Sequence, residues 1–205
     1  MDEKTSVVRR KYLVILFLNA AVELAESSKA DLDAGRFFSI LSRHRAFIEH
    51  RCKMIWLAYF ATEEEICGIV EEPDNPKTFP SLTDIERQIG VGSPSALSTP
   101  VNEEGTTYLK LLHQFTHGSI RPITMLSAGF KVEGIRKLVQ QNTRDIKAGY
   151  CYAFGCLRGW SLEKLRDRLQ TIRGDNDQDV LLKELRLSES ELESVVKAPI
   201  GRSDE

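Results

Sequence analysis

The sequence predicts an all-α protein built as an up-and-down helical bundle. Apolar residues recur at three- and four-residue spacing over long segments, and no stretch alternates apolar and polar residues as a half-buried strand does. At several points a Ser or Thr is followed three residues later by Glu or Asp, which is typical of a helix start. With 205 residues, the chain is long enough for one sizeable core and an appendage.

The expected helices cover, in chain order, residues 6–33, 36–61, 62–72, 81–89, 103–117 and 132–158. Gly35 separates the first two, and the pairs Thr62/Glu65 and Ser81/Asp84 cap the third and fourth. Residues 90–102 are rich in Gly, Ser and Pro and predict a mobile surface loop. We expect a bundle domain over 1–158 and, over 159–205, a small appendage of short helices that either packs on the bundle or hangs from it.

The segment RRKYLVILFLNAAVELA, residues 9–25, has two interpretations. Its basic start and apolar run resemble a signal peptide. However, Asn19 and Glu23 interrupt the run, which is too short to span a bilayer. The helical spacing of its apolar residues favours an amphipathic first helix, with these residues on its apolar side: Leu13, Leu16, Phe17, Ala20, Ala21 and Leu24. We therefore expect a cytoplasmic protein without membrane contact, and export remains the alternative.

Composition restricts the function classes. Apolar residues make up 41% and charged residues 28%, as in ordinary globular proteins, and the net charge of −2 provides no global field for nucleic acid. Any RNA contact must therefore come from a local basic patch. The four cysteines form no CxxC pair, which favours free thiols in a reducing compartment. No cofactor motif is present, and we expect no cofactor.

The second expected helix carries two polar residues on its apolar stripe, His44 and Arg51. A buried cation without a partner would cost several kcal/mol, so Arg51 must meet a carboxylate, a carbonyl or solvent. Glu23 and Glu26 of the first helix are possible partners. An internal ion pair that holds helices together is the structural interpretation of Arg51.

Beside this stripe, Arg45, Glu49 and Lys53 follow one another at four-residue spacing, and Trp56 comes next. Residues four apart stack on one flank of a helix, so alternating charges there can form a solvated, salt-bridged face. The same residues can also bind a ligand.

Two histidines, His113 and His117, stand four apart in LKLLHQFTHGSIRP, with Gly118 and Arg121 after them. On a helix their rings converge, so the pair can bind a metal, contact a phosphate, or divide acid and base roles. The spacing alone is a weak signal.

The combination of these motifs resembles a family of uncharacterised bacterial helical proteins. That family has an Arg-x3-Glu-x3-Arg/Lys-x2-Trp helix followed by a Leu-His-x3-His-Gly segment, matched here by the Arg45–Trp56 stretch and by LHQFTHGSI. Its layout is similar to the HEPN-like domains of toxin–antitoxin and defence systems, and the resemblance covers residues 10–158. It implies a bacterial, HEPN-like bundle and a homodimer. HEPN ribonucleases also carry an Arg-x4–6-His motif late in the bundle, but Arg144 has no such histidine after it.

Three functions follow as hypotheses, and they leave open whether the chain is an enzyme. In an RNA-binding or ribonuclease-like site, His117 would act as base and His113 as acid, and Glu49 would orient a histidine. The phosphate or nucleotide contacts of this site would come from Arg45, Lys53, Arg121 and Trp56. Alternatively, the same residues form a structural polar seam in a non-catalytic binding or regulatory module with a protein partner. In a second alternative, His113 and His117 bind a metal together with Glu49 or His44.

Overall fold

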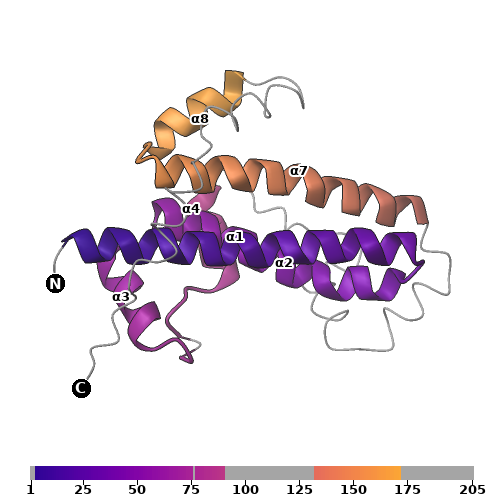
Figure 1. Cartoon of the computed structure of the whole chain (residues 1–205), viewed down its shortest axis with the longest axis horizontal. Coiled ribbons are helices and arrows are strands. Elements are labelled where there is room, and N and C mark those ends of the chain that lie inside the picture. Colours follow the sequence, from indigo (N-terminus) through magenta and orange to yellow (C-terminus); the bar gives the residue numbers. More distant parts are fainter. Residues whose placement is uncertain (1–2, 76, 91–131, 172–205) are drawn as a thin grey trace. The chain divides into compact units, whose positions relative to one another are not determined.

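The computed structural model of the chain describes residues 3–75, 77–90 and 132–171 (Figure 1). These residues form six helices and no strand: α1 Glu3–Asp33, α2 Phe37–Tyr59, α3 Glu63–Glu71, α4 Leu82–Ile89, α7 Val132–Leu157 and α8 Leu162–Thr171. The predicted all-α bundle is thus confirmed, with helix boundaries within three residues of the expected ones where both can be compared. The expected helix over 103–117 and nearly all of the expected loop over 90–102 lie outside the described residues.

A glycine with left-handed backbone angles follows the last turn of α1 and of α7. Gly35 has φ +69° and Gly159 has φ +70°. After α1, the N–H groups of Arg36 and Gly35 donate to the carbonyls of Asp31 and Leu32, at 2.8 and 3.1 Å. The corresponding bonds after α7 are Trp160 to Gly155 and Gly159 to Cys156. This is the Schellman arrangement, which satisfies the last carbonyls of a helix and requires the positive φ that glycine adopts without strain.

The two short helices begin where their caps predict. The N–H of Glu65 donates to the Thr62 hydroxyl at 3.2 Å, and the N–H of Thr62 donates to the Glu65 carboxylate at 2.7 Å. At α4, the N–H of Asp84 donates to the Ser81 hydroxyl, which itself donates to the Asp84 carboxylate. These bonds satisfy orphan backbone donors of the first turn, so the helix starts are determined locally.

The chain divides into two compact units, each containing segments of α1, α2 and α7. Unit 1 comprises Met1–Leu18, Met54–Pro80 and Lys147–Glu205, and unit 2 comprises Asn19–Lys53 and Ser81–Ile146.

In unit 1, side-chain hydrogen bonds connect the C-terminal end of α2 to both α1 and α7. The guanidinium of Arg10 in α1 donates to the carbonyls of Leu57 and Ala61, at 2.6 and 2.7 Å. These are carbonyls of the last turn of α2 and the residues after it, so the cation also lies at the negative end of the helix dipole. On α7, the Tyr152 carbonyl accepts a hydrogen bond of 2.9 Å from the Tyr59 hydroxyl.

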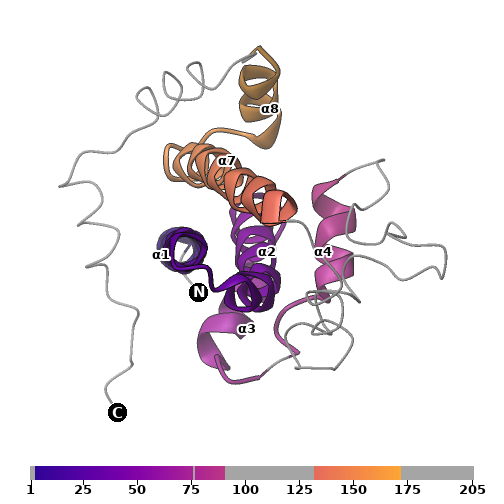
Figure 2. The same cartoon turned by 90° about the vertical axis from the view of Figure 1, so that its right-hand side faces the viewer.

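The helix α8, which belongs to the expected appendage, packs within unit 1 (Figure 2). Its Leu165 is fully buried in a cluster with Cys151, and aromatic side chains of α2 and α7 surround that cluster. Gly155 allows this approach, because a Cβ built there would lie 3.3 Å from Leu165 and 2.7 Å from the Tyr59 hydroxyl. Of the two expectations for this segment, α8 follows the one in which it packs on the helices before it.

In unit 2, α2 and α7 share an apolar core. Ile40 and Leu41 of α2 pack with Ile135 and Val139 of α7, and the partly buried residues around them are Leu32, Phe37 and Leu138. His44 follows Leu41 by three residues on α2, and Asn142 follows Val139 by three residues on α7, so each lies next to this core on its own helix.

The buried face of α1 differs from the expected one. The apolar side predicted for this helix included Leu16, but that side chain is 49% exposed. The buried apolar residues of α1 are Leu13, Val14, Leu18 and Ala21. The run of six apolar residues over 13–18 places apolar side chains on every face of the helix, so periodicity alone could not identify the buried one. Among the described helices, none combines the length and the apolar character needed to cross a membrane.

Candidate functional site

The polar residues on the stripe of α2 meet α7 within unit 2. Arg51 forms an ion pair with Asp145, and the two side chains are 30% and 24% exposed. The partner carboxylate is therefore on α7, rather than being Glu23 or Glu26 of α1, whose side chains are exposed. Arg51 thus has the carboxylate partner that its place on the apolar stripe predicts, whereas the predicted partners Glu23 and Glu26 were wrong.

His44 lies two helical turns before Arg51 on α2 and is buried. The pKa of its imidazole is lowered to about 4, mainly by burial and also by the positive charge of Arg51, whereas the neighbouring Asn142 side chain opposes the shift. The ring stacks on Phe47 with a centroid distance of 6.0 Å. His44 is consequently neutral at pH 7 and contributes no charge to the site.

Asn142 of α7 is fully buried. Its contact with His44 is poorly aligned: among the described residues, neither polar atom of the amide has a partner with good hydrogen-bond geometry. His44, Arg51, Asn142 and Asp145 thus form a polar seam between α2 and α7, and we use this name for these four residues.

Cys52 follows Arg51 and is buried beside the seam. The pKa of its thiol is raised to about 11, mainly by burial; Arg51 opposes the shift, and the carboxylates of Glu86, Asp145 and Glu49 contribute to it. A thiol with so high a pKa is protonated at pH 7 and is a poor nucleophile. The seam therefore contains no activated cysteine.

The predicted second line of α2 divides between the two units. In unit 2, Lys53 donates to the Glu49 carboxylate at 2.7 Å, as the four-residue spacing predicts, and both side chains are partly buried. Arg45 lies half-buried on the same helix. Trp56 belongs to unit 1, where it is 1% exposed and its ring lies 6.0 Å from that of Phe79. A side chain so deeply buried offers almost no surface to a ligand.

The other predicted site residues, His113, His117 and Arg121, lie outside the described residues. Their proximity to Glu49 or to the cations of α2 therefore remains a prediction. Among the described residues, no group of three or more His, Cys, Asp or Glu side chains could hold a metal ion.

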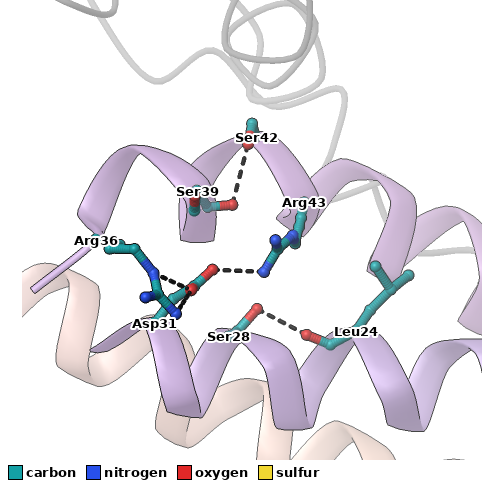
Figure 3. Close-up of polar contacts among 7 residues, drawn as sticks. All are labelled: Leu24, Ser28, Asp31, Arg36, Ser39, Ser42 and Arg43. Carbon is teal, nitrogen blue, oxygen red and sulfur yellow. Dashed lines mark hydrogen bonds and ion pairs between the residues drawn. The ribbon is translucent and has the colours of Figure 1, made fainter. Parts of the chain in front are cut away.

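A second polar cluster was missed by the sequence analysis (Figure 3). The carboxylate of Asp31 in α1 is almost fully buried and pairs with Arg36 at 2.6 Å and with Arg43 at 2.5 Å. Ser28, one turn earlier, is buried too, and its hydroxyl donates to the carbonyl of Leu24. Asp31 could have been found from its spacing, since it lies ten residues after buried Ala21 on one stripe of α1.

The comparisons with known proteins identify one family. A model described as a family of unknown function, DUF6988, matches residues 18–151, which is more than half of the chain. The chain belongs to DUF6988. Comparison with curated proteins and with solved structures finds no match.

The DUF6988 segment includes the polar groups of the candidate site. It contains the Asp31 cluster, the pair of Glu49 and Lys53, and the whole polar seam, and it also includes the predicted residues over 113–121. It ends before α8. An uncharacterised family was expected from the same residues, and the family match bears out that part of the resemblance.

Proposed function

We propose that this DUF6988 protein is a HEPN-like helical RNA-binding protein, and that His113 and His117 give it ribonuclease-like chemistry. The observation that carries the proposal is the charge gathered around α2. Five cations lie at or next to this helix (Arg36, Arg43, Arg45, Arg51 and Lys53), and the ion pairs among them use three carboxylates (Asp31, Glu49 and Asp145). Residues 36–53 carry these five cations and one carboxylate of their own, Glu49, which contrasts with a whole-chain charge of −2.

Such a local excess suits a phosphodiester backbone. A polyanion that is drawn to the cations of α2 releases counterions, which provides affinity without sequence specificity. Arg45 and Lys53 would hold a phosphate, and Glu49 would limit and orient the positive charge. His117 would then take the proton of a 2′-hydroxyl and His113 would return one to the leaving oxygen. The HEPN-like proposal includes a homodimer, which light scattering of the purified protein would detect.

Binding is tested with a fluorescently labelled single-stranded RNA, by anisotropy over a series of salt concentrations. We expect the wild-type affinity to fall linearly with salt on logarithmic axes. The double substitution Arg45→Gln/Lys53→Gln is expected to lower the slope by about 0.7, the value for the loss of one phosphate contact with a single strand. Arg87→Gln is the matched control, because Arg87 is an exposed arginine on another helix of unit 2. An affinity that does not respond to salt would contradict the proposal.

Chemistry is tested separately by a cleavage assay on mixed RNAs, with and without EDTA, using His113→Ala and His117→Ala variants whose helicity is checked by circular dichroism. Cleavage that survives EDTA and disappears in the folded variants supports the acid–base roles. Loss of cleavage with EDTA points instead to a metal. If RNA binds but is never cleaved, the RNA-binding part of the proposal stands and the ribonuclease-like part fails.

A second candidate function is a non-catalytic regulatory module whose polar residues are structural. It is favoured by the ion pairing itself: Arg36, Arg43, Arg51 and Lys53 each contact a carboxylate of their own unit. Networks of this kind can specify one helix arrangement with little net gain in stability. If the Arg45→Gln/Lys53→Gln protein unfolds at lower denaturant concentration but binds RNA like the wild type, this candidate replaces the first.

A further inference from the structure

The Asp31 cluster contains one buried carboxylate and two arginines, which is one cation more than the carboxylate needs. Asp31 is 2% exposed, and a carboxylate buried to that extent needs at least one cation to offset its desolvation. It has two, one on each of its oxygens: the Arg36 side chain contacts Oδ1 at 2.6–2.7 Å and Arg43 contacts Oδ2 at 2.5 Å (Figure 3). The cluster therefore carries one positive charge in excess.

Both arginine side chains are held by the buried Asp31 carboxylate, yet each leaves a large part of its surface exposed to solvent. Their side chains are 61% and 43% exposed for Arg36 and Arg43, although each has its guanidinium bound to the same carboxylate. The backbone N–H of Arg36 also donates to the carbonyl of Asp31 in the turn after α1, which ties this residue to Asp31 a second time. Among the described residues, the Nη1 group of Arg36 and the Nε and Nη2 groups of Arg43 have no acceptor.

We propose that Arg36 and Arg43 form a phosphate-binding pair, with Asp31 as the buried anchor that positions them, and that its ligand is the phosphodiester backbone of RNA. This inference rests on the proposed RNA-binding function and adds a contact site to it. Planar guanidinium groups match the oxygens of a phosphate and donate to them in a bidentate manner. Because the shared carboxylate already restricts both side chains, less conformational entropy is lost when a phosphate binds.

The test compares the single-stranded RNA affinity of the wild-type chain with that of the triple variant Asp31→Asn/Arg36→Gln/Arg43→Gln. The first substitution removes the buried charge that the other two would leave unpaired, so the variant retains a neutral cluster. Its net charge falls by one, and Arg87→Gln changes the net charge by the same amount without touching the cluster. We expect the triple variant to bind about tenfold more weakly or worse at about 50 mM salt, with the salt slope reduced by about 0.7, and the control to bind like the wild type.

The outcomes separate this inference from the proposed function. If the wild type binds no RNA at low salt, the proposed function fails and the inference fails with it. If the wild type binds and the triple variant binds equally well, or if Arg87→Gln weakens binding as much, only the inference is overturned. Should circular dichroism show the triple variant unfolded, Arg36→Lys/Arg43→Lys replaces it. That variant keeps both charges and the pairing with Asp31 but loses the guanidinium forks, so RNA binding weakened several-fold with normal folding supports the proposal.

Discussion

Arg51 of α2 and Asp145 of α7 form an ion pair within unit 2, and His44 and Asn142 lie next to it in the same seam. We expect Arg51→Met and Asp145→Asn each to lower the free energy of unfolding by about 2 kcal/mol, because each leaves a partly buried charge without its partner. The double variant should be less destabilised than the sum of the single variants, with a coupling of about 1 kcal/mol. Urea unfolding of the four proteins measures this cycle.

The control for this cycle is the exposed pair of Arg87 and Asp84, with side chains 74% and 48% exposed. Solvent screens such a pair, so Arg87→Gln should change the free energy of unfolding by less than about 0.5 kcal/mol. If the effects of the Arg51 and Asp145 substitutions on the free energy of unfolding were additive within about 0.5 kcal/mol, the ion pair would have no role in joining the two helices.

Stability should depend on His44 between pH 6.5 and 4. Burial depresses the pKa of His44 in the folded chain to about 4, so in this window the unfolded chain binds a proton that the folded chain does not. The free energy of unfolding should therefore fall as the pH is lowered from 6.5 to 4, by about 3 kcal/mol in total from this residue. His44→Gln should remove that part of the slope, as measured by urea unfolding at several pH values.

His50→Gln on the same helix is the matched control for His44, since it removes a histidine that lies outside the seam. The interpretation is overturned if the wild-type and His44→Gln proteins lose stability in parallel as the pH falls.

Two glycines of α7 should respond oppositely to alanine. A Cβ at Gly155 would lie 2.7 Å from the Tyr59 hydroxyl and 3.3 Å from Leu165, whereas a Cβ at Gly134 would meet nothing within 4 Å. We expect Gly134→Ala to stabilise the protein by about 0.5–1 kcal/mol through helix propensity. Gly155→Ala should destabilise it by about 1 kcal/mol, because overpacking exceeds that gain. Thermal unfolding of both variants provides the comparison, and a stabilising Gly155→Ala would show that α8 does not pack tightly there.

Arg10 should stabilise the fold through the two-pronged geometry of its guanidinium group, and not through its positive charge alone. Its two bonds reach the carbonyls of Leu57 and Ala61 together, which the single ammonium of a lysine cannot reproduce with the same geometry. Arg10→Lys should therefore lower the free energy of unfolding by about 1 kcal/mol, and Arg10→Met by about 2 kcal/mol. Denaturant titration measures both values, and equal stability of Arg10→Lys and wild type would contradict this role for the fork.

Helix boundaries were predictable because the signals that determine them are local. Thr62 with Glu65, Ser81 with Asp84, and Gly35 each act on backbone groups within a few residues. The alternating charges of Glu49 and Lys53 were predictable for the same reason, since residues four apart on a helix are neighbours in any fold.

The candidate site was predictable only in part. The buried position of His44 and the need of Arg51 for a carboxylate followed from their place on an apolar stripe. The Asp31 cluster followed from the same kind of pattern but was not found. Arg36 lies in the turn after α1 and Arg43 lies in the next helix, and both look like ordinary surface residues in the sequence.

The sequence by itself thus determined, to within three residues, where helices α1 to α4 and α7 begin and end, because local hydrogen bonds decide this. Only the tertiary structure decided that Asp145 is the partner of Arg51, that Trp56 is buried in unit 1, and which face of α1 is covered. Each of these depends on which helices pack together and at what rotation. The rotation of each helix about its axis depends on side-chain volumes and desolvation summed over the whole core. A short stretch of sequence does not carry this information.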